Sequence, residues 1–244
     1  MKKILLGIAL SVVVLQGCKK DDDDEEIVVL TVEEQKAYDD AAAKDFLTKN
    51  YLNSKGVITP FSTTTDTDDN EKKLIDYDYK TLPSGVIYIV IPNAQPDPGK
   101  EIANPSDVLT LMQVVKTYIS TKVDDKIIFG GEAIFSNSVA TGNATIDPGY
   151  FYMKNSVITK YNKDNGTTYG RDFFEIEGFQ EGLKYFKSFE LDPSANYNMQ
   201  GIIIVPSRAA YARDNNVYGV SYNNRSFVFN FQLYDAKTRL STED

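Results

Sequence analysis

The chain has 244 residues, a formal net charge of −9 at pH 7, a single cysteine and no histidine. One cysteine excludes an internal disulfide, and the lack of histidine excludes the hydrolytic triads and zinc sites that depend on it. The acidic balance argues against a nucleic-acid partner, because phosphates are bound by basic patches, and the length suits one domain with its own core.

Residues 1–18 begin with a basic start and continue into an apolar run that ends in LQGC at 15–18. The run is shorter than the about 20 residues that cross a bilayer, and this pattern is typical of a signal peptide. LQGC resembles a bacterial lipobox, which implies removal of residues 1–17 and a lipid on Cys18 that anchors the protein to a membrane. An ordinary signal peptide followed by an incidental cysteine is the alternative.

Residues 18–30 continue with the charged run KKDDDDEE at 19–26. Such a run stays solvated, so we expect an acidic tether after the lipid. The run resembles the export signal of Bacteroidetes lipoproteins, which implies attachment to the outer membrane with exposure at the cell surface. A plain tether is the alternative, and both place the protein in the cell envelope.

A helix is predicted from Thr31 to near Gly56. Thr31 with Glu34 three residues later forms a capping box, which is typical of a helix start. Its apolar face packs either on the rest of the domain or on a second copy, which would make a homodimer. The residues of this face are Tyr38, Ala42, Phe46 and Leu47.

Residues 62–70 are rich in serine, threonine and aspartate and predict a polar linker, so residues 31–80 form an N-terminal helix and linker. Asp66, Asp68 and Asn70 alternate as at the start of an EF-hand loop. The loop lacks that motif's later glycine and glutamate, so we expect no metal site here.

Strand patterns follow at 86–91, 108–119, 126–135, 202–205 and 227–233, the last alternating as a half-buried strand. Between them, residues 174–177 predict a strand that turns at Gly178 into a short helix. Phe179, Leu183 and Phe186 share one face of this helix at i, i+4 and i+7, so that face is buried.

Three motifs recur in a known order: EIEGFQEGL at 175–183, VPSRAAY at 205–211 and FVFNFQL at 227–233. Together they resemble the motifs of the FKBP-type peptidyl-prolyl cis-trans isomerases. TLPSGVIYIVI at 81–91 and FSNS at 135–138 resemble further family segments, so the resemblance covers about residues 81–236.

The resemblance implies an α+β fold, in which an FKBP-like bent antiparallel β-sheet wraps around a short α-helix, plus the N-terminal helix. The FKBP-like domain then spans 81–237. Residues 136–171 exceed the family's minimal core and form an insertion whose pattern predicts no particular structure.

The resemblance also implies a site and a partner. Proline-containing polypeptides are the clients, no cofactor is needed, and the lack of histidine is no obstacle because isomerisation breaks no covalent bond. Tyr211 offers its hydroxyl to the substrate carbonyl, and Phe179 forms the pocket floor where most members have Trp. Phe135, Ile176, Phe229 and Val220 line the rest of the pocket.

The chain departs from the family pattern at Gln113, where a Tyr is expected, at Ser136, where Asp is usual, and at Glu175, which replaces an apolar residue. The segment 219–224 also lacks the family's prolines. Two hypotheses stay open: a lipid-anchored isomerase that helps envelope or surface proteins fold, and a degenerate FKBP-like module that binds polypeptides without significant turnover. Phe135, Ile176 and Phe229 also suit a plain core role in such a sheet.

Overall fold

The structure is a computed structural model that describes residues 29–102 and 104–244. Cys18, the signal sequence at 1–17 and the acidic run at 19–26 lie outside the described residues. Within the described ranges, no helix combines the length and the apolarity that crossing a membrane requires.

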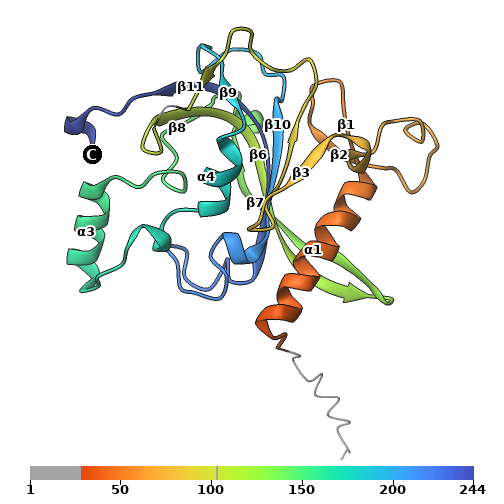
Figure 1. The fold of residues 1–244 in the computed structure, drawn as a ribbon, viewed down its shortest axis with the longest axis horizontal. Helices are drawn as coiled ribbons and strands as arrows, with labels where there is room; N and C mark the ends of the chain where they lie inside the picture. Colours follow the sequence, from red (N-terminus) through yellow and green to blue (C-terminus); the bar gives the residue numbers. More distant parts are fainter. Residues whose placement is uncertain (1–28, 103) are drawn as a thin grey trace, which may run out of the picture.

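The described residues form a β-sheet with short helices and one long helix (Figure 1). The helices are α1 (Val32–Lys49), α2 (Ser138–Thr141), α3 (Asn155–Asn165) and α4 (Glu177–Leu183), with 3-10 turns η1 (Leu74–Asp76), η2 (Arg171–Phe173), η3 (Ser207–Ala209) and η4 (Ser241–Glu243). The strands are β1 (Asn50–Leu52), β2 (Ile58–Pro60), β3 (Tyr79–Thr81), β4 (Ile87–Val90), β5 (Lys100–Glu101), β6 (Val108–Val123), β7 (Lys126–Asn137), β8 (Thr145–Ile146), β9 (Lys187–Ser188), β10 (Gly201–Val205) and β11 (Arg225–Lys237).

The main sheet has the order β3-β4-β10-β11-β6-β7, and β8 pairs with β6. Each neighbouring pair is antiparallel. Two small sheets, β1-β2 and β5-β9, flank it. The expected α+β class with an antiparallel sheet, a short helix and an N-terminal helix is therefore confirmed.

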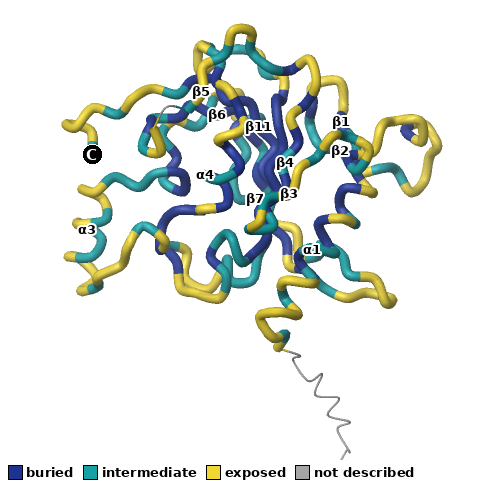
Figure 2. The backbone as a smooth tube through the Cα atoms, in the orientation of Figure 1, coloured by how far each residue is buried: buried dark blue, intermediate teal, exposed yellow. Residues whose placement is uncertain are grey.

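The main sheet is covered on both faces. One apolar cluster lies on the α4 side and includes Phe179, Leu183 and Phe229. A second lies on the α1 side and includes Phe46 and Leu47. Figure 2 accordingly shows the central strands as buried between α4 and α1.

Helix α4 lies close against β10 because two glycines face that strand. A Cβ atom on Gly178 would lie 2.5 Å from Val205 Cγ1, and one on Gly182 would lie 2.8 Å from Ile203 Cγ2. The predicted apolar face is buried at Phe179, Leu183 and Phe186, although Phe186 follows the end of the helix. The strand expected at 174–177 is wrong, because η2 ends at Phe173, residues 174–176 form a turn and irregular backbone, and α4 begins at Glu177.

Helix α1 begins with the predicted capping box: Glu34 N–H donates to Thr31 Oγ1 (3.2 Å) and Thr31 N–H donates to Glu34 Oε2 (2.7 Å). The helix ends at Lys49 and not near Gly56, because Asn50 adopts an extended backbone and begins β1. Its apolar face packs on the chain's own sheet through the cluster that contains Phe46.

Strand β11 differs from its prediction. It was expected to be half-buried, but residues 226–235 are buried without interruption, since α1 covers the face that would otherwise meet solvent. The insertion at 136–171 contributes α2, β8 and α3. The polar run at 62–70 forms a loop in which Asp68 Oδ2 accepts from Ser62 N–H (2.8 Å).

The packing of α1 predicts a specific loss of stability. Leu47→Ala removes a side chain that is 0% exposed and should lower the free energy of unfolding by about 2–5 kcal/mol. Val32→Ala, at a side chain that is 64% exposed on the same helix, should change it by less than about 0.5 kcal/mol. Urea unfolding followed by circular dichroism measures both. Equal midpoints for the two variants would contradict the packing of α1 on the sheet.

Candidate functional site

The structure gathers most of the predicted pocket residues in one place. Ile176, Phe179, Tyr211 and Phe229 belong to the apolar cluster on the α4 side of the sheet, and Phe135 packs against it. The first four are buried, with Tyr211 only 3% exposed. Val220 is 74% exposed on the loop between η3 and β11 and does not join them.

The aromatic rings of this cluster are in direct contact. Phe179 on α4 stacks on Phe229 of β11, with ring centroids 4.2 Å apart. Phe135 at the end of β7 meets Phe227 of β11 edge to face at 5.2 Å. The site is thus an aromatic assembly across β7, β11 and α4, held by ring contacts that each add about 0.5–1.5 kcal/mol beyond their buried area.

Tyr150, which sequence analysis missed, lies within this assembly. Its ring centroid is 5.3 Å from that of Phe135, 5.7 Å from that of Phe179 and 5.8 Å from that of Phe229. Its hydroxyl donates to Gln113 Oε1 (2.8 Å), and burial raises the pKa of this phenol, so it stays protonated. Tyr150 therefore fills the space between the three predicted pocket aromatics.

The Tyr150 contact links Gln113 and Ser136 in one hydrogen-bond chain. Gln113 Nε2 donates to Ser136 Oγ (3.0 Å), so both unusual residues join one hydrogen-bond chain with the Tyr150 hydroxyl. Gln113 is buried and its polar atoms need partners. Tyr150, which comes from residues 136–171, thus brings both a ring and a hydroxyl to Gln113.

Glu175, the third departure, holds the segment that follows Tyr150. It is buried and accepts from Arg171 Nη1 (2.7 Å), Met153 N–H (2.8 Å) and Gln180 Nε2 (2.9 Å). Ile176 N–H also donates to the Tyr150 carbonyl (2.8 Å). These bonds fix residues 150–153 on the segment just before α4 and so keep Tyr150 in the assembly.

The Tyr211 hydroxyl points into the protein. It donates to the Phe174 carbonyl (2.9 Å), and burial raises its pKa, so the phenol remains a neutral donor. Tyr211 also packs edge to face against Tyr218, with centroids 6.2 Å apart. In this conformation its hydroxyl hydrogen is engaged by the chain itself.

The loop between η3 and β11 covers the outer side of Phe135. Tyr218 and Tyr222 each meet the Phe135 ring edge to face, at 5.5 and 5.3 Å between centroids. Gly219 between them has a φ of +68°, which favours glycine. Its neighbour Val220 points away from the assembly, as its exposure requires.

Asp39 on α1, also missed by sequence analysis, fixes the turn that leads to Tyr211. Asp39 is buried, and its Oδ2 accepts from Ser207 N–H (2.9 Å) and Ser207 Oγ (2.6 Å). Its Oδ1 accepts from Ser120 Oγ (2.8 Å). The sequence does contain one signal for this role. Asp39 lies on the same apolar helix face as Ala43 and Phe46, at i+4 and i+7 from it, where an acidic residue is unusual.

The chemistry available at this site is contact with apolar and aromatic groups. Among the described residues, no group of three or more acidic or other metal-ligating side chains is arranged to hold a metal ion. A bound group would meet the rings of Phe135, Phe179 and Phe229 only after Tyr150 moved.

Comparison with known proteins gives distant structural similarity. No protein-family profile and no curated protein sequence matches the chain. The structure is similar to the crystal structure of FkpA from Escherichia coli, with 22% identity, a TM-score of 0.35, and coverage of 65% of this chain and 51% of FkpA. It is also similar to a peptidyl-prolyl cis-trans isomerase from Pseudomonas syringae, with 13% identity, a TM-score of 0.34, and coverage of 66% of this chain and 81% of that chain.

The Asp39 contacts predict that Asp39 contributes more to the free energy of unfolding than its neighbour Asp40 does. Asp39→Ala leaves the buried Ser207 amide and hydroxyl without their acceptor and should lower the free energy of unfolding by about 3 kcal/mol. Asp40→Ala removes only a half-exposed ion pair with Arg208 and should cost less than about 1 kcal/mol.

Urea unfolding gives both values, and hydrogen exchange at the Ser207 amide gives the local effect. Exchange should be faster in Asp39→Ala alone. Unchanged exchange in that variant would show that Asp39 does not hold the turn before Tyr211.

Proposed function

We propose that this chain is a lipid-anchored, FKBP-like protein of the cell envelope that binds proline-containing polypeptide segments without significant isomerase turnover. The observation that carries the proposal is the burial of Ile176, Phe179 and Phe229 around Tyr150. The three sequence motifs support an FKBP-like module, and the closed aromatic assembly supports binding over catalysis.

Catalysis of isomerisation needs an enzyme that binds the twisted amide better than the planar forms. An open apolar pocket and a free donor for the carbonyl meet that need. In this chain Tyr150 occupies the aromatic assembly and the Tyr211 hydroxyl donates to Phe174. Both groups would have to be displaced before a prolyl amide could enter.

Displacement of Tyr150 has an energetic cost. Emptying a buried aromatic position costs about 3–5 kcal/mol, and the Gln113 amide oxygen would lose the Tyr150 hydroxyl as its donor. The state that accepts a polypeptide is therefore a minor one, and the apparent affinity falls by the fraction of molecules in that state. We infer weak, reversible engagement of clients in place of rapid turnover.

A second candidate is an active peptidyl-prolyl isomerase that assists the folding of envelope or surface proteins. The observation that favours it is that Phe179, Tyr211 and Phe229, which come from three separate motifs, meet in one cluster. In that case the client proline itself displaces Tyr150. The two candidates differ in turnover and not in the location of the site.

The envelope location rests on the sequence. LQGC at 15–18 and KKDDDDEE at 19–26 support a lipid on Cys18 and attachment to the outer membrane, with surface exposure if the acidic run acts as an export signal. Cys18→Ser should abolish incorporation of labelled fatty acid and move the protein out of the membrane fraction. Retention of label in the variant would contradict lipidation at Cys18.

Turnover is tested with the purified protein and a fluorescent peptide that contains an apolar residue before proline. The wild type at micromolar concentration should leave the uncatalysed rate of cis-to-trans conversion unchanged. A clear acceleration that Phe179→Ala abolishes would overturn the proposal and establish the isomerase candidate.

Binding of the same peptide tests the role of Tyr150. Tyr150→Ala opens the space between Phe135, Phe179 and Phe229 and should tighten peptide binding at least about tenfold in a fluorescence titration, because the closed state no longer competes. Tyr185→Ala, at an exposed tyrosine outside the assembly, serves as the matched control and should bind as the wild type does. Weaker binding by a folded Tyr150→Ala protein would contradict a closed site.

A further inference from the structure

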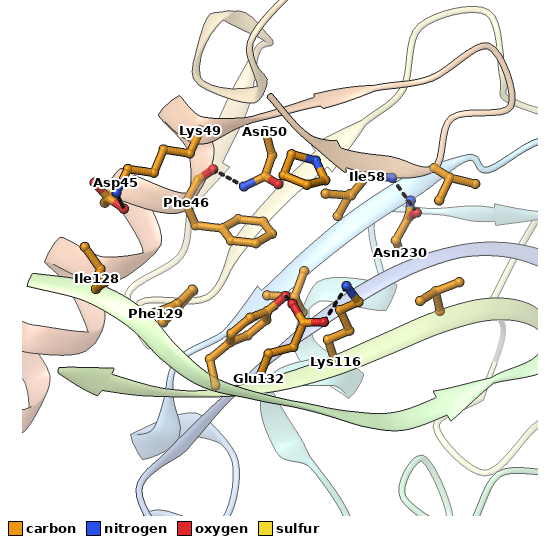
Figure 3. A pocket seen from close by; sticks show the side chains of 15 residues that line it. Asp45, Phe46, Lys49, Asn50, Ile58, Lys116, Ile128, Phe129, Glu132 and Asn230 are labelled. Carbon is orange, nitrogen blue, oxygen red and sulfur yellow. Dashed lines mark hydrogen bonds and ion pairs between the residues drawn. The ribbon is translucent and has the colours of Figure 1, made fainter. Parts of the chain in front are cut away.

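A second concave site lies on the opposite face of the sheet, between α1 and the β6–β7 ribbon. It is a cavity of about 260 Å³, here called the α1 cavity (Figure 3). Its walls come from the end of α1, the β1–β2 hairpin and strands β6, β7 and β11. None of the predicted pocket residues lines the α1 cavity. Binding there would therefore be independent of the proposed function.

The interior of the α1 cavity is apolar. Figure 3 shows Phe46, Ile58 and Phe129 directed toward the space from three different elements. Val114 and Val228 from the sheet complete the inner wall. Asn230 is the polar residue at the inner end, and its amide is used by the fold: Oδ1 accepts from Ile58 N–H (3.1 Å) and Nδ2 donates to the Gly56 carbonyl (3.0 Å).

Charged groups stand at the edge of the cavity in two balanced pairs. Lys49 Nζ lies 2.8 Å from Asp45 Oδ2 on α1, and Lys116 Nζ lies 2.7 Å from Glu132 Oε1 on the β6–β7 ribbon. Because each pair is neutral, the edge offers no net charge to attract an ion. It does offer carboxylate oxygens, which accept more than one hydrogen bond each.

Tyr118 joins the second pair. Its hydroxyl donates to Glu132 Oε2 (3.0 Å), and burial raises the pKa of the phenol, which therefore stays protonated. The Tyr118 ring is stacked on Phe129, with centroids 5.1 Å apart. The cavity thus combines aromatic walls with a fixed acceptor group, Glu132, at its opening.

We propose that the α1 cavity binds a compact, uncharged ring compound of about ten non-hydrogen atoms that carries one N–H or O–H donor. The size follows from the volume, since an apolar cavity of about 150 Å³ holds benzene and this one is larger. The ligand is expected to be uncharged because the two ion pairs at the edge of the cavity are neutral. It is expected to carry a hydrogen-bond donor because the Glu132 carboxylate can accept one.

Indole is the probe that tests the proposal, with 1-methylindole as its match without the N–H donor. Each is titrated into the purified protein while the methyl NMR signals of Ile58, Val114 and Ile128 are followed. Indole should shift these signals in a saturable way with one site per chain, and 1-methylindole should bind at least about fivefold more weakly.

Two valine variants on β6 locate the site. Val114→Phe places a ring in the cavity and should weaken indole binding at least about tenfold. Val123→Phe makes the same change at the exposed end of the strand and should leave indole binding unchanged. If Val114→Phe does not fold, Glu132→Met, at an exposed residue, replaces it and should remove the preference for indole over 1-methylindole, because methionine offers no strong acceptor.

Three results would overturn the proposal. The first is an absence of saturable shifts at millimolar indole, which would mean that the cavity closes in solution. The second is indole binding of equal strength in folded Val114→Phe, which would place the ligand elsewhere. The third is equal affinity for indole and 1-methylindole in the wild type, which would remove the role of the Glu132 acceptor.

Discussion

The structure depends on the burial of β11 on both of its faces. Phe227, Phe229 and Phe231 point toward α4, while Val228 and Asn230 between them face α1. A strand in this position excludes water only if a helix covers each side of the sheet. The N-terminal helix is therefore part of the core of this fold, and the aromatic assembly and the α1 cavity are built on opposite faces of the same strand.

The same dense packing decides the state of the aromatic site. Tyr150 bonds to the buried Gln113 amide and brings its ring against Phe229. Glu175 then holds the backbone next to Tyr150. Gln113, Ser136 and Glu175, which lie far apart in the sequence, thus belong to one set of contacts around Tyr150.

Much of the fold could be predicted from local sequence patterns. Contacts between residues that lie far apart in the sequence could not be predicted in this way. The capping box at Thr31 and the spacing of Phe179 and Leu183 depend on residues a few positions apart, so their physical meaning is visible in the sequence. Tyr150 meets Gln113 across 37 residues, and Asp39 meets Ser207 across 168. No periodic pattern records such contacts, so the closure of the site and its support from α1 could be found only in three dimensions.

The most direct test of the closed site is an NMR measurement of ring contacts in the free protein with labelled Tyr and Phe side chains. We expect nuclear Overhauser effects from the Tyr150 ring to the rings of both Phe179 and Phe229, in line with centroid distances of 5.7 and 5.8 Å. Absence of both contacts in the folded protein, with Tyr150 exposed to solvent, would contradict a closed site and indicate an open pocket.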